Sequence, residues 1–290
     1  MVFAIAKKQH VYESYILTDQ DAQSRLEVVP ERGGIITSWS IQGKDLLYLD
    51  TERFADERLS VRGGIPILFP ICGNLPNNTY IHNERKYSLK QHGFARDLAW
   101  KVTDQTTSNQ AGITLELNSN EQTLAVYPFQ FQLAFTYQIK GNTLEIQQQY
   151  TNHSNEPMPF ATGLHPYFAT ADKTKLEYKI PATKYQDQMS KEVHPFQGSF
   201  DLSQNEIDVA FRQLSNTSAS VIDTAAGLKL QLDYSNLYST LVFWTVKGKD
   251  YYCLEPWSAP RNALNTGEDL TQLAPGASCQ TVVRLTATFL

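Results

Sequence analysis

Hydrophobic and polar residues alternate along much of the chain, with a period of two. Successive side chains of a β-strand point to opposite faces, so this period predicts half-buried strands. Long patterns with the helical period of 3.6 residues are scarce. The alternation is clearest in Arg25–Val29, Ile35–Ile41, Ile113–Leu117, Phe131–Ile139, Leu144–Gln148, Leu228–Leu232 and Thr281–Phe289.

Turn signals punctuate the alternating segments. In Gln138–Leu144, Gly141 and Asn142 separate two such segments, which predicts a β-hairpin. Short helical turns are expected at Phe54–Leu59, Gln122–Val126 and Asn205–Val209. Many short strands with closely spaced turns and few helices predict an all-β, antiparallel sandwich or barrel.

The chain shows no sign of a division into parts. It has no linker rich in Pro, Gly or Ser, no internal repeat and no low-complexity segment, so we expect a single domain over residues 1–290. Its longest loops are expected at Asp50–Ser60, Gly73–Lys86 and Thr183–Asn216. Substrate contacts usually lie on such loops.

Composition and charge exclude several classes of partner. The net charge is −5 and no run of Lys or Arg is present, so neither a nucleic acid nor a membrane surface is expected as a partner. No stretch approaches 18 apolar residues, and the charges near the start follow the short apolar run, opposite to a secretory signal. Cys72, Cys253 and Cys279 form no CxxC pair and look like reduced thiols. We therefore expect a cytoplasmic protein.

Three segments place titratable groups among Gly, Pro and aromatic residues. They are Gln91–Arg96, Gly163–Phe168 and Cys253–Trp257. Such groups are costly to bury unless they have a partner or a function. Two histidines and one carboxylate, widely separated in sequence, are typical of an acid/base site that the fold assembles.

Glu255 is the carboxylate of this set. Tyr251, Cys253 and Glu255 would share one face of a strand. Pro256 is expected to end this strand, so Glu255 would be its last residue. Partial desolvation there would raise the pKa of Glu255 toward the range of a general base. The alternative is a structural glutamate paired with an arginine.

The two histidines have similar alternatives. His165 precedes Pro166, which favours extended backbone, so its ring points either into a cleft or into a core where it is hydrogen-bonded. His92 lies beside Gly93, which permits close approach of a ligand. Alternatively, His92 is a loop residue that contacts a backbone carbonyl.

Arg62 begins a further candidate segment, because the following Gly63-Gly64 pair can present backbone N–H groups to an anion. An ordinary turn before a strand is the alternative. The segment lacks the Lys-Ser/Thr of a phosphate loop and the third glycine of a dinucleotide-binding loop.

Other chemistries find less support in the sequence. Two histidines and a carboxylate could hold a metal, but no HExxH motif or short His-x-His spacing is present, so no metal is expected. The G-x-S-x-G motif of serine hydrolases is also absent. A glycosidase needs a second carboxylate, for which Asp208 is the candidate.

Taken together and in order, these segments resemble the aldose 1-epimerase (galactose mutarotase) superfamily. The Arg-Gly-Gly-Ile-Pro and His-Gly-Phe-Ala-Arg motifs look most like its hexose-6-phosphate 1-epimerase branch. The resemblance implies a large antiparallel β-sandwich with the sugar in an open cleft. It extends over Arg62–Pro70, Gln91–Trp100, Tyr127–Phe129, Asn152–Phe168, Asp208, Cys253–Trp257 and Leu273–Gly276.

The resemblance also implies roles for individual residues. Glu255 would be the general base and His165 the general acid, and His92 would bind and polarise the sugar near its ring oxygen. His165 must then be protonated while Glu255 is ionised, a state that a neighbouring carboxylate favours. Opening and closing the sugar ring with these two groups needs neither a cofactor nor a metal.

Three further residues would contact the substrate. Asp208 would hydrogen-bond sugar hydroxyls, and Arg62 and Arg96 match the arginines that hold substrate in the phosphosugar branch. Ile71–Pro76 departs from the pattern of that branch, so an aldohexose and its 6-phosphate both remain candidates, with the phosphate favoured. The expected partner is this small molecule, and the protein is expected to be a monomer or weak homodimer. A carbohydrate-binding protein without turnover is the main alternative, and a glycosidase is the third.

Overall fold

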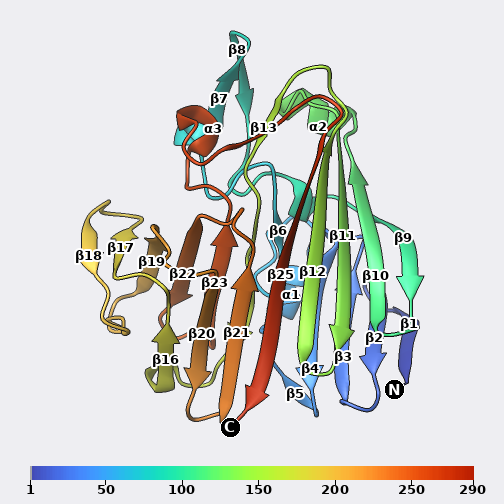
Figure 1. Ribbon diagram of the computed structural model, residues 1–290, viewed down its shortest axis with the longest axis vertical. Helices are drawn as coiled ribbons and strands as arrows, with labels where there is room; N and C mark the ends of the chain where they lie inside the picture. The colour runs from blue at the N-terminus through green and yellow to red at the C-terminus, as the bar shows by residue number, and fades with distance from the viewer. Residues whose placement is uncertain (1) are drawn as a thin grey trace.

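The computed structural model describes residues 2–290, so only Met1 of the predicted unit 1–290 lies outside the described residues. Strands make up 51% of the chain and helices 8%, and the paired strands form antiparallel sheets (Figure 1). The prediction of an all-β antiparallel sandwich is therefore confirmed. Within residues 2–290 no helix is long and apolar enough to cross a membrane.

The first sheet has five strands in chain order. Its strands β3 and β4 contain the predicted segments Arg25–Val29 and Ile35–Ile41. The five strands are β1 (Phe3–Gln9), β2 (Glu13–Asp19), β3 (Ser24–Val29), β4 (Ile35–Ile41) and β5 (Lys44–Asp45).

A long eight-stranded sheet contains the other predicted alternating segments. The predicted hairpin is confirmed, since Lys140 pairs with Thr143 across the turn. In spatial order the strands are β16 (Leu176–Lys179), β20 (Ser218–Asp223), β21 (Leu228–Tyr234), β25 (Ser278–Phe289), β12 (Thr143–Asn152), β11 (Phe131–Lys140), β10 (Ala111–Asn118) and β9 (Lys101–Thr106).

A second eight-stranded sheet carries most of the candidate site. Its central strand β23 pairs with β22 on one side and with both β14 and β15 on the other. In spatial order the strands are β18 (Val193–Pro195), β17 (Lys184–Asp187), β19 (Glu206–Phe211), β22 (Thr240–Val246), β23 (Tyr251–Trp257), β14 (Gly163–Leu164) and β6 (Ile67–Leu68), with β15 (Tyr167–Ala169) beside β23.

Short elements complete the fold. The predicted helical turn Gln122–Val126 is helix α2, whose first turn is capped by the side chain of Asn120, whereas α1 begins and ends earlier than the predicted turn Phe54–Leu59. The helices are α1 (Thr51–Ala55), α2 (Glu121–Val126), α3 (Ala263–Thr266) and the 3-10 turns η1 (Pro76–Asn78), η2 (Ala95–Asp97) and η3 (Lys173–Lys175). Two strand pairs are β7 (Thr79–His82) with β8 (Arg85–Ser88) and β13 (Met158–Phe160) with β24 (Thr271–Leu273).

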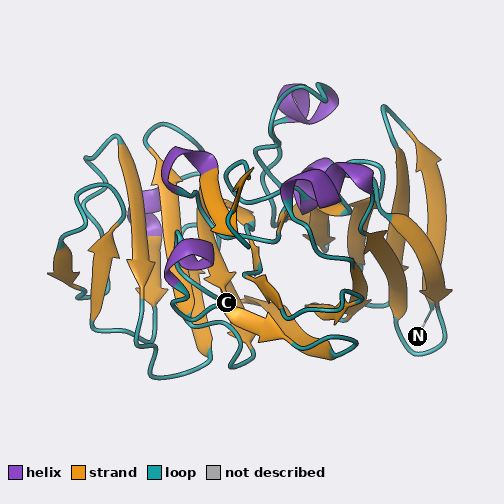
Figure 2. Ribbon diagram, turned by 90° about the horizontal axis from the view of Figure 1, so that it is seen from above, coloured by secondary structure: helices purple, strands orange, loops and turns teal. Residues whose placement is uncertain are grey.

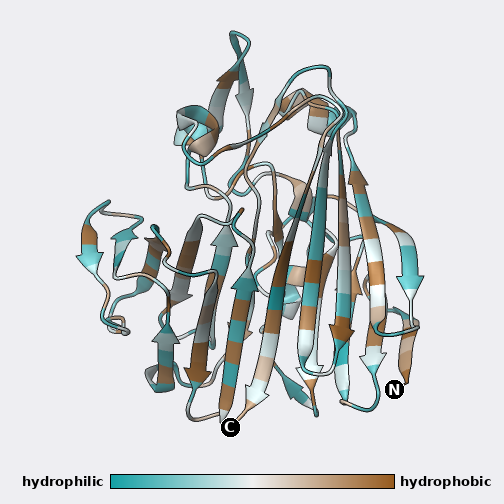
Figure 3. Ribbon diagram, in the orientation of Figure 1, coloured by the Kyte–Doolittle hydropathy of each residue, from teal (hydrophilic) through white to brown (hydrophobic). Residues whose placement is uncertain are grey.

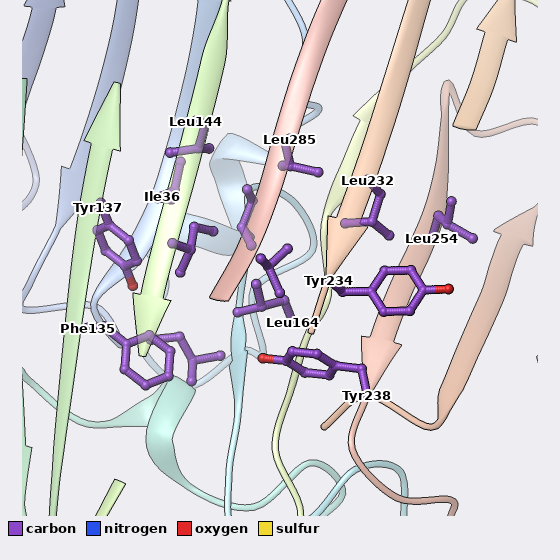
Figure 4. Close-up of a cluster of buried hydrophobic side chains, with 14 of the residues drawn as sticks. Ile36, Phe135, Tyr137, Leu144, Leu164, Leu232, Tyr234, Tyr238, Leu254 and Leu285 are labelled. Atoms are coloured by element: carbon purple, nitrogen blue, oxygen red, sulfur yellow. The ribbon is translucent and has the colours of Figure 1, made fainter. Parts of the chain in front are cut away.

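The long sheet lies against the other two large sheets, as the view from above shows (Figure 2). Brown and teal bands alternate along its strands, which is the period of two that the sequence shows (Figure 3). One core cluster joins the three sheets. Figure 4 shows part of it, with Ile36 from β4, Leu144 and Leu285 from the long sheet, and Leu164 and Leu254 from the site sheet.

Several local predictions are wrong. The predicted loop Thr183–Asn216 contains β17, β18 and β19, and the predicted loop Gly73–Lys86 contains η1, β7 and part of β8. Asn205–Val209 is not a helical turn, because β19 begins at Glu206 and pairs with β22 along its whole length. Glu206 and Asp208 are less buried than Ile207 and Val209, which is the strand period.

Pro256 does not end β23 either, since the strand continues to Trp257. On one side of β23, β14 pairs with Trp257 and β15 pairs with residues up to Cys253, so neither strand pairs with Pro256. The missing N–H of Pro256 is tolerated there.

Candidate active site

All six residues predicted for the site line one cavity of about 420 Å³. They come from distant parts of the chain: β23, β19, the link between β14 and β15, the loop before β6, and η2 with the loop before it. Long-range pairing of strands therefore assembles the cavity. The six residues are Arg62, His92, Arg96, His165, Asp208 and Glu255.

Glu255 and His165 form the centre of the cavity. His165 Nε2 lies 3.3 Å from Glu255 Oε1, and the Trp257 indole N–H donates to Glu255 Oε2 at 3.0 Å. Only 1% of Glu255 is exposed. Among residues 2–290 no arginine lies within ion-pair distance of Glu255, so the alternative of a glutamate paired with an arginine does not apply.

Burial acts on both members of this pair. It raises the pKa of Glu255 well above its usual value, and the hydrogen bond from Trp257 only partly opposes this. Burial, followed by the nearby Arg96 charge, lowers the pKa of His165 to about 3. Both shifts favour uncharged forms, so the resting pair holds one proton with its preferred position on Glu255. Burial and the Arg96 charge, and not the neighbouring carboxylate, set the direction of the His165 pKa shift.

The ring of His165 is held by aromatic neighbours. Tyr167 stacks on it with ring centroids 4.7 Å apart and an interplanar angle of 12°, and Trp244 meets it edge-on at 5.8 Å. The backbone N–H of His165 donates to the Pro66 carbonyl. These contacts fix the ring with Nε2 toward Glu255, a requirement for directed proton transfer.

His92 has a defined tautomer. The Gly73 backbone N–H donates to His92 Nδ1 at 3.1 Å, so the ring proton of the neutral imidazole is on Nε2. Burial, followed by the charge of Arg96, lowers the pKa of His92 well below 6.5. His92 Nδ1 accepts a hydrogen bond from a backbone N–H, so the alternative of a ring that contacts a backbone carbonyl is not observed among the described residues. His92 presents a neutral N–H donor.

The backbone around His92 is unusual. His92 itself has a φ of +67°, and Gly93 follows with a φ of +72°. Left-handed backbone at a non-glycine residue is uncommon and persists where surrounding structure holds it. The His92 N–H donates to the Gly73 carbonyl at 2.7 Å, so two hydrogen bonds between these residues hold the ring in place.

Arg62 and Arg96 carry charge that no carboxylate neutralises. Arg62 is exposed at the rim of the cavity, with its guanidinium 5.2 Å from the centre of the Trp244 ring. Arg96 is partly buried, and it donates to the Gln91 carbonyl at 2.9 Å while its Nε has no partner. Neither has an acidic side chain within ion-pair distance among the described residues. Both are placed to bind an anion.

Asp208 is paired with Arg261, a residue that the sequence did not indicate. Arg261 Nη2 lies 2.6 Å from Asp208 Oδ2, and Arg261 Nη1 donates to Asn74 Oδ1 at 2.9 Å. Asp208 Oδ1 is buried without a partner among residues 2–290, so one acceptor is left for a ligand. Burial raises the pKa of Asp208, against the effect of Arg261. Only its position six residues after Glu255 could have drawn attention to Arg261.

Aromatic walls are a further feature that the sequence did not assign. Trp244, Trp257 and Tyr167 all line the cavity. Their faces and edges offer the flat apolar surfaces against which sugar C–H groups pack, while the charged residues offer hydrogen bonds. Trp257 was visible in its segment beside Glu255, but Trp244 lies on β22 within an ordinary apolar strand.

One set of residues could hold a metal ion. Donor atoms of His165, Cys253 and Glu255 lie within 4.8 Å of one another, and all three are buried. The charges of Arg62 and Arg96 act against a cation at this place.

The chain belongs to the aldose 1-epimerase family, whose sequence model matches residues 15–286. The Slr1438 protein of Synechocystis sp. PCC 6803 is 48% identical, covers 96% of each chain and superposes with a TM-score of 0.94. A galactose mutarotase-like protein of Clostridium acetobutylicum, 18% identical over 100% of this chain and 99% of that one, has the same fold with a TM-score of 0.84. A Cenchrus ciliaris protein provisionally named glucose-6-phosphate 1-epimerase is 27% identical over 62% of this chain and 55% of its own.

Proposed function

We propose that this protein is an aldose 1-epimerase that interconverts the α and β anomers of an aldohexose, with the hexose 6-phosphate as the preferred substrate. The observation that carries the proposal is the buried Glu255–His165 pair, 3.3 Å apart, in a cavity of about 420 Å³ lined by aromatic and charged residues. Membership of the aldose 1-epimerase family supports the same reaction class. Simple binding of a sugar does not need such a pair.

The reaction consists of two proton transfers around one bond. The reactive form of the pair has the shared proton on His165 and an ionised Glu255. Glu255 accepts the proton of the C1 hydroxyl while His165 donates its proton to the ring oxygen. The bond between C1 and the ring oxygen breaks, and its electron pair leaves with that oxygen as C1 becomes an aldehyde. Rotation about C1–C2 and closure on the other face of the aldehyde reverse both transfers. After ring closure Glu255 and His165 have regained their starting protonation states and the sugar has the same atoms as before. No redox step is involved.

His92 stabilises the negative charge that develops on the ring oxygen, and it does so by a hydrogen bond without transferring a proton. Because its Nδ1 is occupied by the Gly73 N–H, its Nε2–H is available as a hydrogen-bond donor to the sugar near its ring oxygen. A fixed donor aimed at an oxygen that gains charge in the transition state lowers the barrier. Asp208 Oδ1, which lacks a protein partner, would accept a sugar hydroxyl.

The pH dependence follows from the shared proton. In the productive state the Glu255–His165 pair carries one proton. The pair loses this proton when pH rises through the raised pKa of Glu255. It gains a second proton only near the lowered His165 pKa of about 3. We expect kcat/KM, measured from about pH 5 to about pH 9, to fall as pH rises through the raised pKa of Glu255 and to show no acid limb at the ordinary histidine value. An acid limb near the ordinary histidine value of 6.5, in initial rates measured across this range, would contradict this assignment.

The preference for a phosphate rests on charge. Arg62 and Arg96 face the cavity without a neutralising carboxylate, whereas the charge of Arg261 is balanced by Asp208. An arginine pair without acidic partners matches a phosphate better than a neutral hydroxyl. The similarity to the provisionally named glucose-6-phosphate 1-epimerase supports the same substrate.

Arg62→Ala and Arg96→Ala are each expected to lower kcat/KM for glucose 6-phosphate by about 10- to 100-fold, since a hydrogen bond to a charged group contributes about 1.5–3 kcal/mol. The value for glucose should change far less. Arg58→Ala removes the same charge from an exposed residue outside the cavity and serves as the control. Equal losses for both sugars would remove the phosphate from the proposal.

The direct test of the function is exchange of α and β anomers, measured by NMR or polarimetry with glucose and glucose 6-phosphate. Wild-type protein should exceed the rate in buffer, and His165→Asn should lose about 10²–10⁴-fold of the catalysed rate. If the wild-type protein and His165→Asn exchange both sugars at the buffer rate, the site binds sugar without turnover. Hydrolysis of aryl glycosides that is lost in Asp208→Asn would instead identify a glycosidase.

A further inference from the structure

Arg261 lines the active-site cavity but takes no part in the proposed proton transfers. It lies between β23 and α3, where the backbone is held on both sides. On one side the Ser258 N–H donates to the Thr162 carbonyl at 2.8 Å. On the other side the Ala263 N–H donates to the Pro260 carbonyl at 3.3 Å. The side chain of Arg261 therefore starts from a fixed point beside the site.

The guanidinium of Arg261 is anchored through both of its terminal nitrogens. Nη2 lies 2.6 Å from Asp208 Oδ2, and Nη1 donates to Asn74 Oδ1 at 2.9 Å. Because this contact occupies Oδ2, Asp208 keeps Oδ1, which has no partner among residues 2–290, as an acceptor for a sugar hydroxyl. The planar fork of a guanidinium fixes the direction of both contacts, unlike a lysine ammonium. Arg261 therefore orients the carboxylate of Asp208.

The same side chain contacts the supports of two other site residues. Its guanidinium carbon lies 5.9 Å from the centre of the Trp257 ring, whose indole N–H donates to Glu255. Its stem lies against Gly73, where a Cβ would be only 2.3 Å from the Arg261 Cγ. Gly73 in turn holds His92 by two hydrogen bonds. One arginine thus contacts the groups that hold the general base and the polarising histidine.

We propose that Arg261 is a positioning residue of the active site, which aligns the substrate-binding carboxylate, the general base and the polarising histidine with one another. The inference rests on the proposed function, since this alignment serves two proton transfers on one bound sugar. The charge of Arg261 is balanced by Asp208, unlike the charges of Arg62 and Arg96. Loss of Arg261 should therefore impair glucose and glucose 6-phosphate equally.

The experiment compares Arg261→Met with wild type in anomer exchange of glucose and glucose 6-phosphate. Methionine keeps an unbranched stem against Gly73 and removes both anchoring contacts. We expect kcat to fall about 10- to 100-fold for both sugars, because a small misplacement of reacting groups has an effect of this size. Arg212→Met is the matched control, since Arg212 also pairs with a carboxylate, that of Glu268 at 2.6 Å, but lies outside the active-site cavity. It should leave kcat unchanged.

Asn74→Ala is a milder variant that tests the same role. Asn74 is exposed, and its loss releases Nη1 while the pair with Asp208 remains. We expect kcat to fall about two- to tenfold for both sugars, the effect of one ordinary hydrogen bond. Unchanged kcat in the folded fraction of Arg261→Met and of Asn74→Ala would overturn the proposal, because Arg261 would then only stabilise the fold. A loss confined to glucose 6-phosphate would identify a phosphate ligand and would also overturn it.

An NMR measurement separates this inference from the proposed function. The Trp257 indole N–H is assigned among the four tryptophans with Trp257→Phe, and the His92 ring nitrogens are assigned with His92→Asn. In wild type the indole N–H should be protected from solvent exchange, and the His92 ring proton should be on Nε2. Arg261→Met should lose this protection and give a mixture of His92 tautomers, whereas Arg212→Met should do neither.

The combined outcomes decide each proposal on its own. If no sugar is turned over but Arg261→Met shows both NMR changes, the positioning role stands and the epimerase proposal fails. If neither NMR signal changes in Arg261→Met, the positioning proposal is overturned, whether or not the wild-type protein turns over sugar.

Discussion

Glu255→Gln is expected to lower catalysed anomer exchange by about 10²–10⁴-fold, because the amide cannot accept the proton of the C1 hydroxyl. The substitution keeps the shape of the side chain and an oxygen that can accept the Trp257 indole N–H. The geometry of the cavity should therefore survive while the proton transfer is lost. Initial rates by polarimetry, compared with wild type, check this result.

The same substitution should stabilise the folded protein above neutral pH. The pKa of Glu255 is raised in the folded state, so its favourable contribution is present below the unfolded value of 4.5 and is lost as pH rises through the folded value. At alkaline pH the buried carboxylate is a cost that glutamine does not carry. We expect a gain of about 1–2 kcal/mol in the free energy of unfolding near pH 8, and a smaller gain near pH 5.

Glu177→Gln is the matched control, because Glu177 is exposed on β16. It should change neither the rate nor the pH dependence of unfolding, measured by denaturant titration at several pH values. Wild-type activity in Glu255→Gln would exclude Glu255 as the base. Destabilisation at every pH would show that its carboxylate is a structural partner instead.

Gly93→Ala is expected to destabilise the protein by about 3 kcal/mol or more and to impair the site. Gly93 has a φ of +72°, and a Cβ there would lie 2.1 Å from the Phe69 carbonyl oxygen. An alanine must therefore accept left-handed backbone and also displace a backbone atom. The segment that moves carries the adjacent His92, so kcat/KM should fall in the fraction that folds.

Gly43→Ala separates the two contributions. Gly43 has nearly the same φ, +75°, but a Cβ there meets nothing within 4 Å. It should cost only the backbone term of about 1–2 kcal/mol and leave activity unchanged. Equal losses of unfolding free energy in the two variants would show that close approach to Phe69 does not matter.

Five strands of the long sheet, β10, β11, β12, β21 and β25, could be predicted because buried and less buried residues largely alternate along them. Phe131–Ile139 falls within β11, and the Gly141-Asn142 turn joins it to β12 as expected. The predictions for Asn205–Val209 and Pro256 failed because the local sequence pattern does not show how these residues pair in the sheet. β19 carries Glu206 and Asp208 at the wetter positions of a short strand. Pro256 pairs with Leu241 of β22 and continues β23, because neither β14 nor β15 pairs with it on the other side.

The residues of the candidate site could likewise be predicted only in part from the sequence. Glu255, His165 and His92 could be singled out because titratable groups among Gly, Pro and aromatic residues need a partner or a function. Arg261 could not, because its importance lies in contacts with Asp208 and Asn74, both distant in sequence. The protonation of the central pair was also beyond local pattern, since it depends on how completely the fold excludes water around it.

By itself, the sequence determined the all-β class and the hairpin, and it singled out Glu255, His165 and His92, because alternation and costly polar groups are local properties. Arg96 and the role of Asp208 came from the resemblance to a known family. Only the tertiary structure decided that Glu255 is paired with His165 rather than with an arginine, and that Arg62 and Arg96 are left without acidic partners. The physical reason is that burial and charge pairing depend on residues that the fold brings together across the sheets. The sequence on either side of a residue does not determine them.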